Sequence, residues 1–352
     1  MHADTCAPSA TPCPSTANGH RAPVRHPLCA ALFAVALAAG LAGCGKAPPA
    51  GNAGAKRLHL AFVANSPGEY WAIVNLGCDI AAQQLGEVDL SFRYPSATTI
   101  EDQQRIVNSL LAAGVDGIAI SPIDPEKQTE FLNEVAAKTL LVCADSDAPK
   151  SKRVSYIGTD NVAAGAEAAT LLKAALPGGG RVALFVGYAN AQNTRDRVAG
   201  IRAGLAGSNL QLVETFEDGQ KSALVGENLT KALSRHPDLA GVMGVAGYHG
   251  PALRKALRDA GRTGQVKIVC FDDNSDTLEG IGAGEIHGTI AQKPFQVGKE
   301  TIVHMRDRLR GNNLARGQVF IPFRALTGEN VAHHIAQQQG IANFLKESSL
   351  RP

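Results

Sequence analysis

The feature that most constrains the fold of this chain is a regular alternation of short apolar runs with longer amphipathic segments. The apolar runs, which are predicted strands, cover residues 58–64, 88–94, 117–121, 140–144 and 155–158. Helical patterns lie between them at about 71–85, 100–113 and 125–138. In the second of these, Ile106, Leu110 and Ala113 recur at helical spacing, and Thr99 can cap the helix start. Strands and helices that alternate in this way predict a parallel sheet covered on both faces.

A second series of the same kind follows the first. Its predicted strands cover residues 181–187, 210–216, 241–245, 266–271 and 288–291, and its helices lie at about 161–176, 193–206, 223–234, 250–260 and 275–282. A long helix at about 294–309 and a polar tail to residue 352 complete the chain. We therefore expect an α/β protein of two similar, doubly wound parallel-sheet domains.

Three crossings between the domains are expected, near residues 158–160, near Gln292 and near Pro322. They assign residues 57–159 and 292–321 to an N-terminal lobe, and residues 160–291 and 322–352 to a C-terminal lobe. The length of 352 residues suits two domains of about 150 residues each.

The N-terminal region differs from the rest of the chain. Arg21 and Arg25 precede an apolar run at 31–39, which is shorter than the roughly 20 residues that span a bilayer. A basic segment, a short apolar core and small residues indicate an export signal, although a buried helix that ends in a chance cysteine is the alternative. The ending Leu41-Ala42-Gly43-Cys44 resembles the bacterial lipoprotein signal. This resemblance implies that residues 1–43 are removed and that Cys44 carries a lipid.

Residues 44–56, which are rich in Gly, Pro and Ala, are then expected to form a flexible tether. The sequence leaves open whether the anchor sits in the inner or the outer membrane. Of the seven cysteines, Cys78, Cys143 and Cys270 belong to the folded part, and their apolar surroundings predict buried free thiols. No C-x-x-C pair occurs, so we expect no metal site and no cofactor.

Composition excludes one class of function. The chain has 34 Lys and Arg against 32 Asp and Glu, a net charge of +2, which argues against a strongly basic nucleic-acid-binding protein. A transcriptional regulator would also need a basic helix-turn-helix before the first lobe, where this chain has a signal and a tether.

Polar and aromatic residues follow the predicted strands, where ligands bind in open parallel sheets. The candidate ligand-binding residues are Tyr70, Trp71, Asp145, Asp147, Arg195, Tyr248, Asp272 and Gln292. Because both halves place such residues at the same edge, two facing domains would line one cleft with them. Carboxylates accept hydrogen bonds, Arg donates them and amides do both, so the set suits the hydroxyl groups of a sugar. The rings of Tyr70 and Trp71 could pack on the apolar face of a sugar ring.

Each candidate has a purely structural alternative. Tyr70 and Trp71 could belong to the core, Asp145 and Asp147 could be solvated loop acids or helix caps, Arg195 could pair with Asp196 on the surface, and Asp272 and Asn193 could cap helices. Asp273 and Asn274 are expected to be capping or solvated residues.

The ordered motifs of the folded part carry a resemblance. They are Tyr70-Trp71, the segment G-V-D-G-I-A-I-S-P at 114–122, the segment Y-I-G-T-D-N at 156–161, Phe271-Asp272 and the segment T-I-A-Q at 289–292. Over about residues 56–325 the chain resembles the periplasmic sugar-binding proteins of the ribose-binding type, the ligand-binding relatives of the lactose-repressor family. The resemblance implies the type I periplasmic binding protein fold, in which two lobes close like a hinge.

The same resemblance implies roles for single residues. Tyr70 and Trp71 match the aromatics that sandwich the sugar, Asp145 an acceptor, Arg195 a donor, Asp272 a carboxylate, and Gln292 a hinge amide. The chain departs from the pattern at three positions. Ser146, followed by Asp147, stands where the ribose-type pattern has Arg, Ala246 stands in place of an Asn that Tyr248 or His249 could replace, and Gly68 aligns with another Asn.

These features predict a lipid-anchored, monomeric solute-binding component of an ABC-type sugar uptake system. It would bind a monosaccharide, a pentose or a hexose, by hinge closure and deliver it to a membrane permease. The alternative is a receptor that feeds a chemotaxis or sensor-kinase pathway. An enzyme is not expected, because the chain has no G-x-S-x-G or H-E-x-x-H motif and no G-x-G-x-x-G after a strand.

Overall fold

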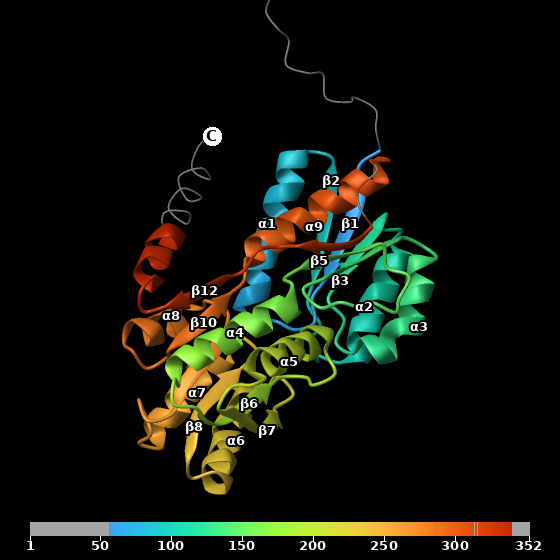
Figure 1. Ribbon diagram of the computed structural model, residues 1–352. Coiled ribbons are helices and arrows are strands. Elements are labelled where there is room, and N and C mark those ends of the chain that lie inside the picture. Colours follow the sequence, from blue (N-terminus) through green and yellow to red (C-terminus); the bar gives the residue numbers. More distant parts are fainter. Residues whose placement is uncertain (1–55, 313, 315, 340–352) are drawn as a thin grey trace, which may run out of the picture. The chain divides into compact units, whose positions relative to one another are not determined.

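Two six-stranded sheets form the framework of the computed structural model, which describes residues 56–312, 314 and 316–339 (Figure 1). All of these residues belong to one unit, Gly54–Pro352. The predicted signal at 1–43, the lipidated Cys44 and the tether up to residue 55 lie outside the described residues. Within the described ranges, no helix is long and apolar enough to cross a membrane.

The first sheet has the strand order β11-β5-β4-β3-β1-β2, and all of its strands run parallel. Its strands are β1 (Leu58–Val63), β2 (Val88–Arg93), β3 (Gly117–Ile120), β4 (Leu140–Ala144), β5 (Ser155–Gly158) and β11 (Gly317–Phe320). Helices α1 (Glu69–Leu85) and α9 (Pro294–Leu309) pack on one face, and α2 (Ile100–Ala112) and α3 (Pro125–Ala136) pack on the other. Because both faces are covered, the central strands are continuous apolar runs.

The second sheet repeats this order as β12-β10-β9-β8-β6-β7. Its strands are β6 (Gly180–Val186), β7 (Leu210–Glu217), β8 (Leu239–Gly244), β9 (Lys267–Phe271), β10 (Gly288–Ala291) and β12 (Arg324–Thr327). Helices α4 (Asn161–Ala175) and α5 (Gln192–Leu205) cover one face. The opposite face is covered by α6 (Ser222–Arg235), α7 (His249–Asp259) and α8 (Ser275–Gly282). The chain is thus a pair of similar doubly wound α/β domains, as the alternating pattern predicts.

Local signals explain where several helices begin. The side chain of Thr99 accepts a hydrogen bond from the backbone N–H of Asp102 at 3.2 Å, which confirms the predicted cap of α2. Asp124 caps α3 in the same way, and Pro125 occupies the first turn, where its missing N–H costs nothing. Cys78, Cys143 and Cys270 are buried free thiols, which confirms the prediction for the folded part.

The chain crosses between the domains three times. It passes from β5 of the first sheet to α4 of the second domain, returns from β10 to α9, and crosses again between β11 and β12. All three crossings leave strands at their carboxyl ends, so they meet at the edge where polar residues gather.

Strands β11 and β12 were not predicted, because the region after α9 reads as a polar tail. Each has only four residues at a sheet edge, and the apolar run at 319–321 is too short to indicate a strand by itself. β12 is also antiparallel to β10, which departs from an all-parallel sheet. The cause is the crossing: the chain enters the second sheet at the carboxyl end of β10, where Arg324 pairs with Ala291, and must run backwards.

Glycines allow two helix pairs to approach closely. A Cβ atom at Gly77 or Gly298 would lie 2.0 Å from a backbone carbonyl oxygen of the facing helix in the α1–α9 pair. Gly165 and Gly200 serve the α4–α5 pair in the same way, with distances of 2.1 and 2.0 Å. Each domain therefore depends on backbone contact between its two packed helices.

We expect Gly298→Ala to lower the free energy of unfolding by about 1–3 kcal/mol, because the new methyl group must push α9 away from α1. Gly282→Ala is the matched control: Gly282 is exposed at the end of α8, with nothing within 4 Å of a Cβ atom. That change should leave stability unchanged or raise it by up to about 1 kcal/mol. Urea unfolding followed by circular dichroism measures both, and equal effects would contradict the close-packing argument.

Candidate functional site

A cavity of about 2080 Å³ is lined by residues from both domains. Its walls include the β1–α1 loop, the start of α5, the segment before α7, the loop after β9 and the crossing after β10. Six of the predicted residues lie in this lining: Tyr70, Trp71, Asp145, Tyr248, Asp272 and Gln292. The volume exceeds that of an ordinary small-molecule pocket of about 300–1,000 Å³, so a small ligand would fill only part of it.

Asp145 and Asp272 hold equivalent places in the two domains. Asp145 directly follows β4 and Asp272 directly follows β9. Their φ angles are 65° and 68°, a left-handed conformation that costs free energy in residues other than glycine. Each backbone N–H continues the ladder to the next strand, at 3.0 Å and 2.9 Å. Such strain is concentrated at ligand sites when the surrounding structure fixes it, and here it turns both carboxylates toward the cavity.

Each carboxylate uses one oxygen inside the protein and leaves the other without a hydrogen-bond donor among the described residues. Oδ2 of Asp145 accepts from Ser121 Oγ and Asn193 Nδ2, both at 3.2 Å. Oδ1 of Asp272 accepts from Gln292 Nε2 at 2.6 Å. Burial raises the pKa of Asp145, and it raises the pKa of Asp272 to about 6. Two acceptor oxygens, one from each domain, therefore remain for a ligand.

Arg197, on α5, is the cation of this site. Its side chain is buried and lies in the cavity lining. Nε donates to Asn161 Oδ1 at 2.8 Å and Nη1 donates to the carbonyl oxygen of Val245 at 2.7 Å. The guanidinium carbon lies 4.5 Å from the centre of the Phe271 ring. Nη2 is buried without a partner in the described part of the chain, so it can donate to a ligand.

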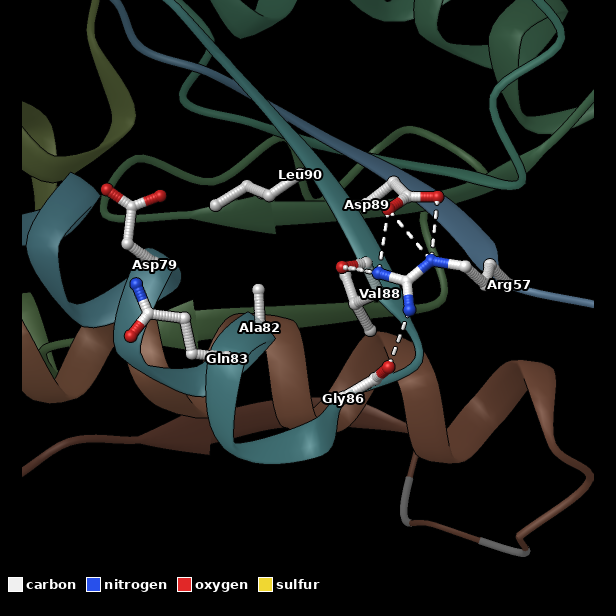
Figure 2. A pocket seen from close by; sticks show the side chains of 8 residues that line it. All are labelled: Arg57, Asp79, Ala82, Gln83, Gly86, Val88, Asp89 and Leu90. Atoms are coloured by element: carbon white, nitrogen blue, oxygen red, sulfur yellow. Dashed lines mark hydrogen bonds and ion pairs between the residues drawn. The ribbon is translucent and has the colours of Figure 1, made fainter. Parts of the chain in front are cut away.

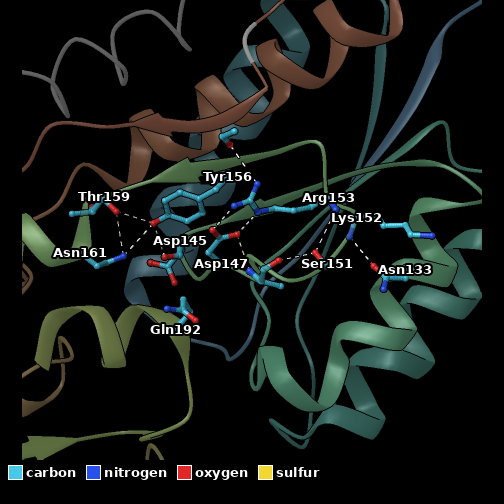
Figure 3. A network of polar contacts seen from close by, with 12 residues as sticks. Asn133, Asp145, Asp147, Ser151, Lys152, Arg153, Tyr156, Thr159, Asn161 and Gln192 are labelled. Atoms are coloured by element: carbon cyan, nitrogen blue, oxygen red, sulfur yellow. Dashed lines mark hydrogen bonds and ion pairs between the residues drawn. The ribbon is translucent and has the colours of Figure 1, made fainter. Parts of the chain in front are cut away.

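A hydrogen-bond network connects the backbone of Asp145 to the carboxylate of Asp272 through the crossings, and Figure 3 shows the part of it around Tyr156 and Thr159. The Tyr156 hydroxyl lies 3.0 Å from the carbonyl oxygen of Asp145 and 2.9 Å from that of Thr159. The Thr159 hydroxyl donates to Gln292 Oε1 at 2.8 Å, and Gln292 in turn binds Asp272. Because Thr159 and Gln292 belong to two different crossings, the network ties the backbone of Asp145 and the carboxylate of Asp272 to the crossing segments.

Tyr70 and Trp71 form the aromatic wall. Their rings meet edge to face, with centroids 5.2 Å apart and planes 86° apart. Trp71 is almost fully buried, and its Nε1 donates to Asn65 Oδ1 at 3.0 Å. The Tyr70 hydroxyl is buried without a hydrogen-bond partner among residues the structure describes. Burial and, secondarily, the Asp145 carboxylate raise its pKa well above the usual value.

Tyr248 lies in the lining, but its hydroxyl is already used by the protein. It donates to Asp218, whose other oxygen lies 2.8 Å from His249 Nε2. Because His249 Nδ1 accepts from the backbone N–H of Ala246 at 3.0 Å, the ring proton sits on Nε2 and faces Asp218. Tyr248 therefore presents mainly a fixed aromatic ring to the cavity.

Asp147 and Arg195 do not reach the cavity lining. Asp147 is buried and forms a two-point ion pair with Arg153, as Figure 3 shows. Arg195 donates to Gln192 at 2.6 Å and lies 3.7 Å from Glu126 of the other domain. Arg197, two residues further along α5, lies in the cavity lining instead.

The helical periodicity of the sequence indicates that Arg197 lies on the buried face of α5. Ile201 and Leu205 mark the buried face of α5, and Arg197 lies one turn before Ile201 on that face. Asn193, considered as a cap, instead contributes its amide to Asp145 across the two domains. Asn274 does cap α8, as expected, and Asp273 is held by His334 at 2.7 Å.

A second cavity, of about 400 Å³, lies beside α1 and β2 (Figure 2). Its charged residue Arg57 is already saturated: it binds Asp89 at 2.7 Å, the carbonyl oxygen of Gly86 at 2.6 Å and that of Val88 at 3.2 Å. With no donor left over, this exposed pocket is a weaker candidate than the cavity between the domains.

The main cavity is suited to binding. It offers free carboxylate acceptors, a free guanidinium donor, amides and an aromatic wall, which together match a compact molecule with several hydroxyl groups. Within the ranges that the structure describes, no group of three or more His, Cys, Asp or Glu side chains could hold a metal ion.

Comparison with known proteins identifies the same architecture. Residues 60–313 match the family described as periplasmic binding protein domain. The D-allose-binding periplasmic protein of Escherichia coli is 26% identical over 249 residues, which cover 68% of this chain and 80% of that protein. The ribose import binding protein RbsB of Salmonella typhimurium is 27% identical over 214 residues, covering 59% and 70% respectively.

Solved structures agree with the sequence relatives. The crystal structure of an ABC transporter solute binding protein from Burkholderia graminis, in complex with D-arabinose, is 31% identical with a TM-score of 0.75. The match covers 79% of this chain and 97% of that protein. The relatives are therefore solute-binding proteins, several of them named for a sugar.

The raised pKa of Asp272 predicts that the free energy of unfolding depends on pH. The Asp272 carboxyl has a folded-state pKa of about 6, against an ordinary value of 3.8, so folding favours its protonated form. Its contribution to the free energy of unfolding is therefore fully present below pH 4 and is lost as the pH rises through 6. Asp272→Asn should therefore raise the free energy of unfolding at pH 8 by about 1–3 kcal/mol, with little effect at pH 4. Urea unfolding at both pH values measures the difference.

Asp89→Asn provides a control of opposite sign. Its exposed carboxylate pairs with Arg57, which lowers the pKa of Asp89, so its removal should not raise stability at pH 8. An Asp272→Asn protein that is no more stable than the parent at pH 8 would contradict the cost assigned to burial.

Proposed function

Because the chain belongs to the family of periplasmic binding protein domains, we propose that it is the solute-binding component of an ABC-type sugar uptake system. It binds a monosaccharide, a pentose or a hexose, reversibly in the cavity between its two domains. It then releases the sugar to a membrane permease and carries out no reaction on it.

The observation that carries this proposal is the unused hydrogen-bonding capacity of one buried cavity. Asp145 and Asp272 each keep an acceptor oxygen, and Arg197 keeps a donor, although all three side chains are otherwise held by the protein. A hydroxyl group both donates and accepts, so several hydroxyls on one small ring can use all three groups at once. A site built in this way rejects analogues that leave its buried groups unpaired.

Hinge closure follows from the placement of these groups on two domains. A ligand that contacts Asp145 and Asp272 together binds best when the domains approach, so it shifts the population toward the closed arrangement. Two contacts between the domains support such a closed state. Asn193 Nδ2 donates to Asp145 at 3.2 Å, and the Tyr188 hydroxyl donates to the carbonyl oxygen of Thr98 at 3.2 Å.

The proposed location is outside the cytoplasm, on a membrane. The family description names the periplasm, which agrees with the export signal at 1–43. A lipid on Cys44 and the tether at 44–56 would keep the binding domains near the permease. Mass spectrometry of the membrane-extracted protein tests this point: a diacylated Cys44 at the N-terminus is expected, and an unmodified cytoplasmic chain would contradict it.

Trp71 gives a direct signal for binding, because it is the only tryptophan and it lies in the cavity lining. We expect at least one compound in a panel of pentoses, hexoses and polyols to change the emission of Trp71 and to release or absorb heat in calorimetry. The Trp71→Phe protein should lose the optical signal while the calorimetric heat persists. No response to any compound in either measurement would contradict the proposal.

Arg197 and Arg195 form a matched pair on one helix. Arg197→Met should weaken binding of any active sugar by roughly 10–100-fold, because a charged hydrogen bond to a hydroxyl is lost. Arg195→Met should change the affinity by less than about threefold, because Arg195 lies outside the lining. Circular dichroism confirms that each variant folds, and a larger loss in the Arg195 variant would reverse the assignment.

A further inference from the structure

The charged groups at the centre of the cavity have a net negative charge when both acids are ionised. Asp145 and Asp272 supply two carboxylates, and Arg197 supplies one guanidinium. The Arg197 guanidinium lowers the pKa of Asp272 and the Asp273 and Asp145 carboxylates raise it, so these charges act on one another through the site. Two carboxylates against one guanidinium leave an excess of one negative charge when both acids are ionised.

The other charged residues of the lining do not supply the missing positive charge. Arg254 and Arg258 bind Glu285, while Asp273 is bound by His334. The remaining charged lining residues are exposed to solvent. The residue next to Asp145 is Ser146, whose buried hydroxyl has no partner within the described ranges, so no cation sits there either.

The protein's own donors also leave the excess charge uncompensated. Asp145 receives hydrogen bonds from the neutral groups of Ser121 and Asn193, and the neutral Tyr70 hydroxyl also stabilises its charge, while Asp272 receives one hydrogen bond from Gln292. A buried carboxylate is stabilised best by a charged partner, and neutral donors replace only part of the lost hydration. The guanidinium of Arg197 is also engaged with Asn161, Val245 and the Phe271 ring.

We propose, on the basis of the function proposed above, that the ligand is a polyhydroxylated primary amine, an amino sugar or an amino polyol. Its ammonium group pairs with the surplus carboxylate of Asp145 and Asp272, and a hydroxyl accepts from Nη2 of Arg197. The complex then contains two negative and two positive charges, and each free oxygen and the free N–H gains a partner. An anionic sugar is disfavoured, because it would add a third negative charge to the same cavity.

The raised pKa values agree with this assignment. Burial raises the pKa of both acids, so the ionised carboxylates are held in the cavity at a cost in free energy. A cationic ligand offsets this cost more fully than a neutral sugar does, because an ammonium group stabilises a carboxylate more strongly than a hydroxyl group. An amine should therefore bind more tightly than the neutral compound of the same shape.

The test compares matched pairs by calorimetry at pH 7.5. The pairs are D-glucose with D-glucosamine, D-galactose with D-galactosamine, D-mannose with D-mannosamine, and pentaerythritol with tris(hydroxymethyl)aminomethane. In the three sugar pairs an ammonium group replaces one hydroxyl group, and in the last pair it replaces one hydroxymethyl group. For the pairs that bind, we expect the amine to be at least about tenfold tighter. In the Asp272→Asn protein the ratio within a pair should fall toward one.

Asp89→Asn is the matched control, since it removes the same charge from a carboxylate that lies outside the cavity lining and pairs with Arg57. In this variant the ratio of the two dissociation constants within each pair should equal that of the parent protein. A general loss of stability would weaken both members of a pair equally, so it would leave this ratio unchanged. Equal or tighter binding of the neutral member overturns the amine assignment and leaves the proposed sugar-binding function standing. If neither neutral nor amino compounds bind, here or in the panel of pentoses, hexoses and polyols, both proposals fail.

Discussion

The site depends on two carboxylates, one buried and one half-buried, that the protein's own donors satisfy only in part. Asp145 and Asp272 stand after equivalent strands, in a strained backbone conformation, and each keeps one oxygen free. Both features cost folding free energy, and the raised pKa values are the electrostatic part of that cost. A ligand that donates to these oxygens recovers part of it, so the instability of the empty site and the affinity for ligand have the same origin.

Duplication of one topology explains how the carboxylates meet. Because the two sheets have the same strand order, the position after the fourth strand recurs in each domain. The three crossings leave the sheets at this same edge, and hydrogen bonds through Tyr156, Thr159 and Gln292 join the backbone of Asp145 to the carboxylate of Asp272. Relative motion of the domains would therefore act directly on the distance and orientation of the two acids.

Most of the fold could be predicted from the sequence because strands buried on both faces leave continuous apolar runs. The edge strands β11 and β12 leave no such run, so they were missed. Residues placed by strand ends, such as Asp145 and Asp272, were found, since topology alone puts them at the cavity. The sequence analysis named Arg195 and not Arg197, because which of the two faces the cavity depends on how α5 is rotated about its axis. It also named Asp147, because the ion pair with Arg153 depends on side-chain positions that the sequence pattern does not reveal.

A crystal structure of the protein with a bound ligand tests the central claim most directly. The account predicts one small polyhydroxylated molecule in hydrogen-bond contact, about 2.7–3.2 Å, with Asp145, Arg197 and Asp272 at the same time. A ligand that contacts only one domain, or that leaves either carboxylate without a new partner, would contradict it.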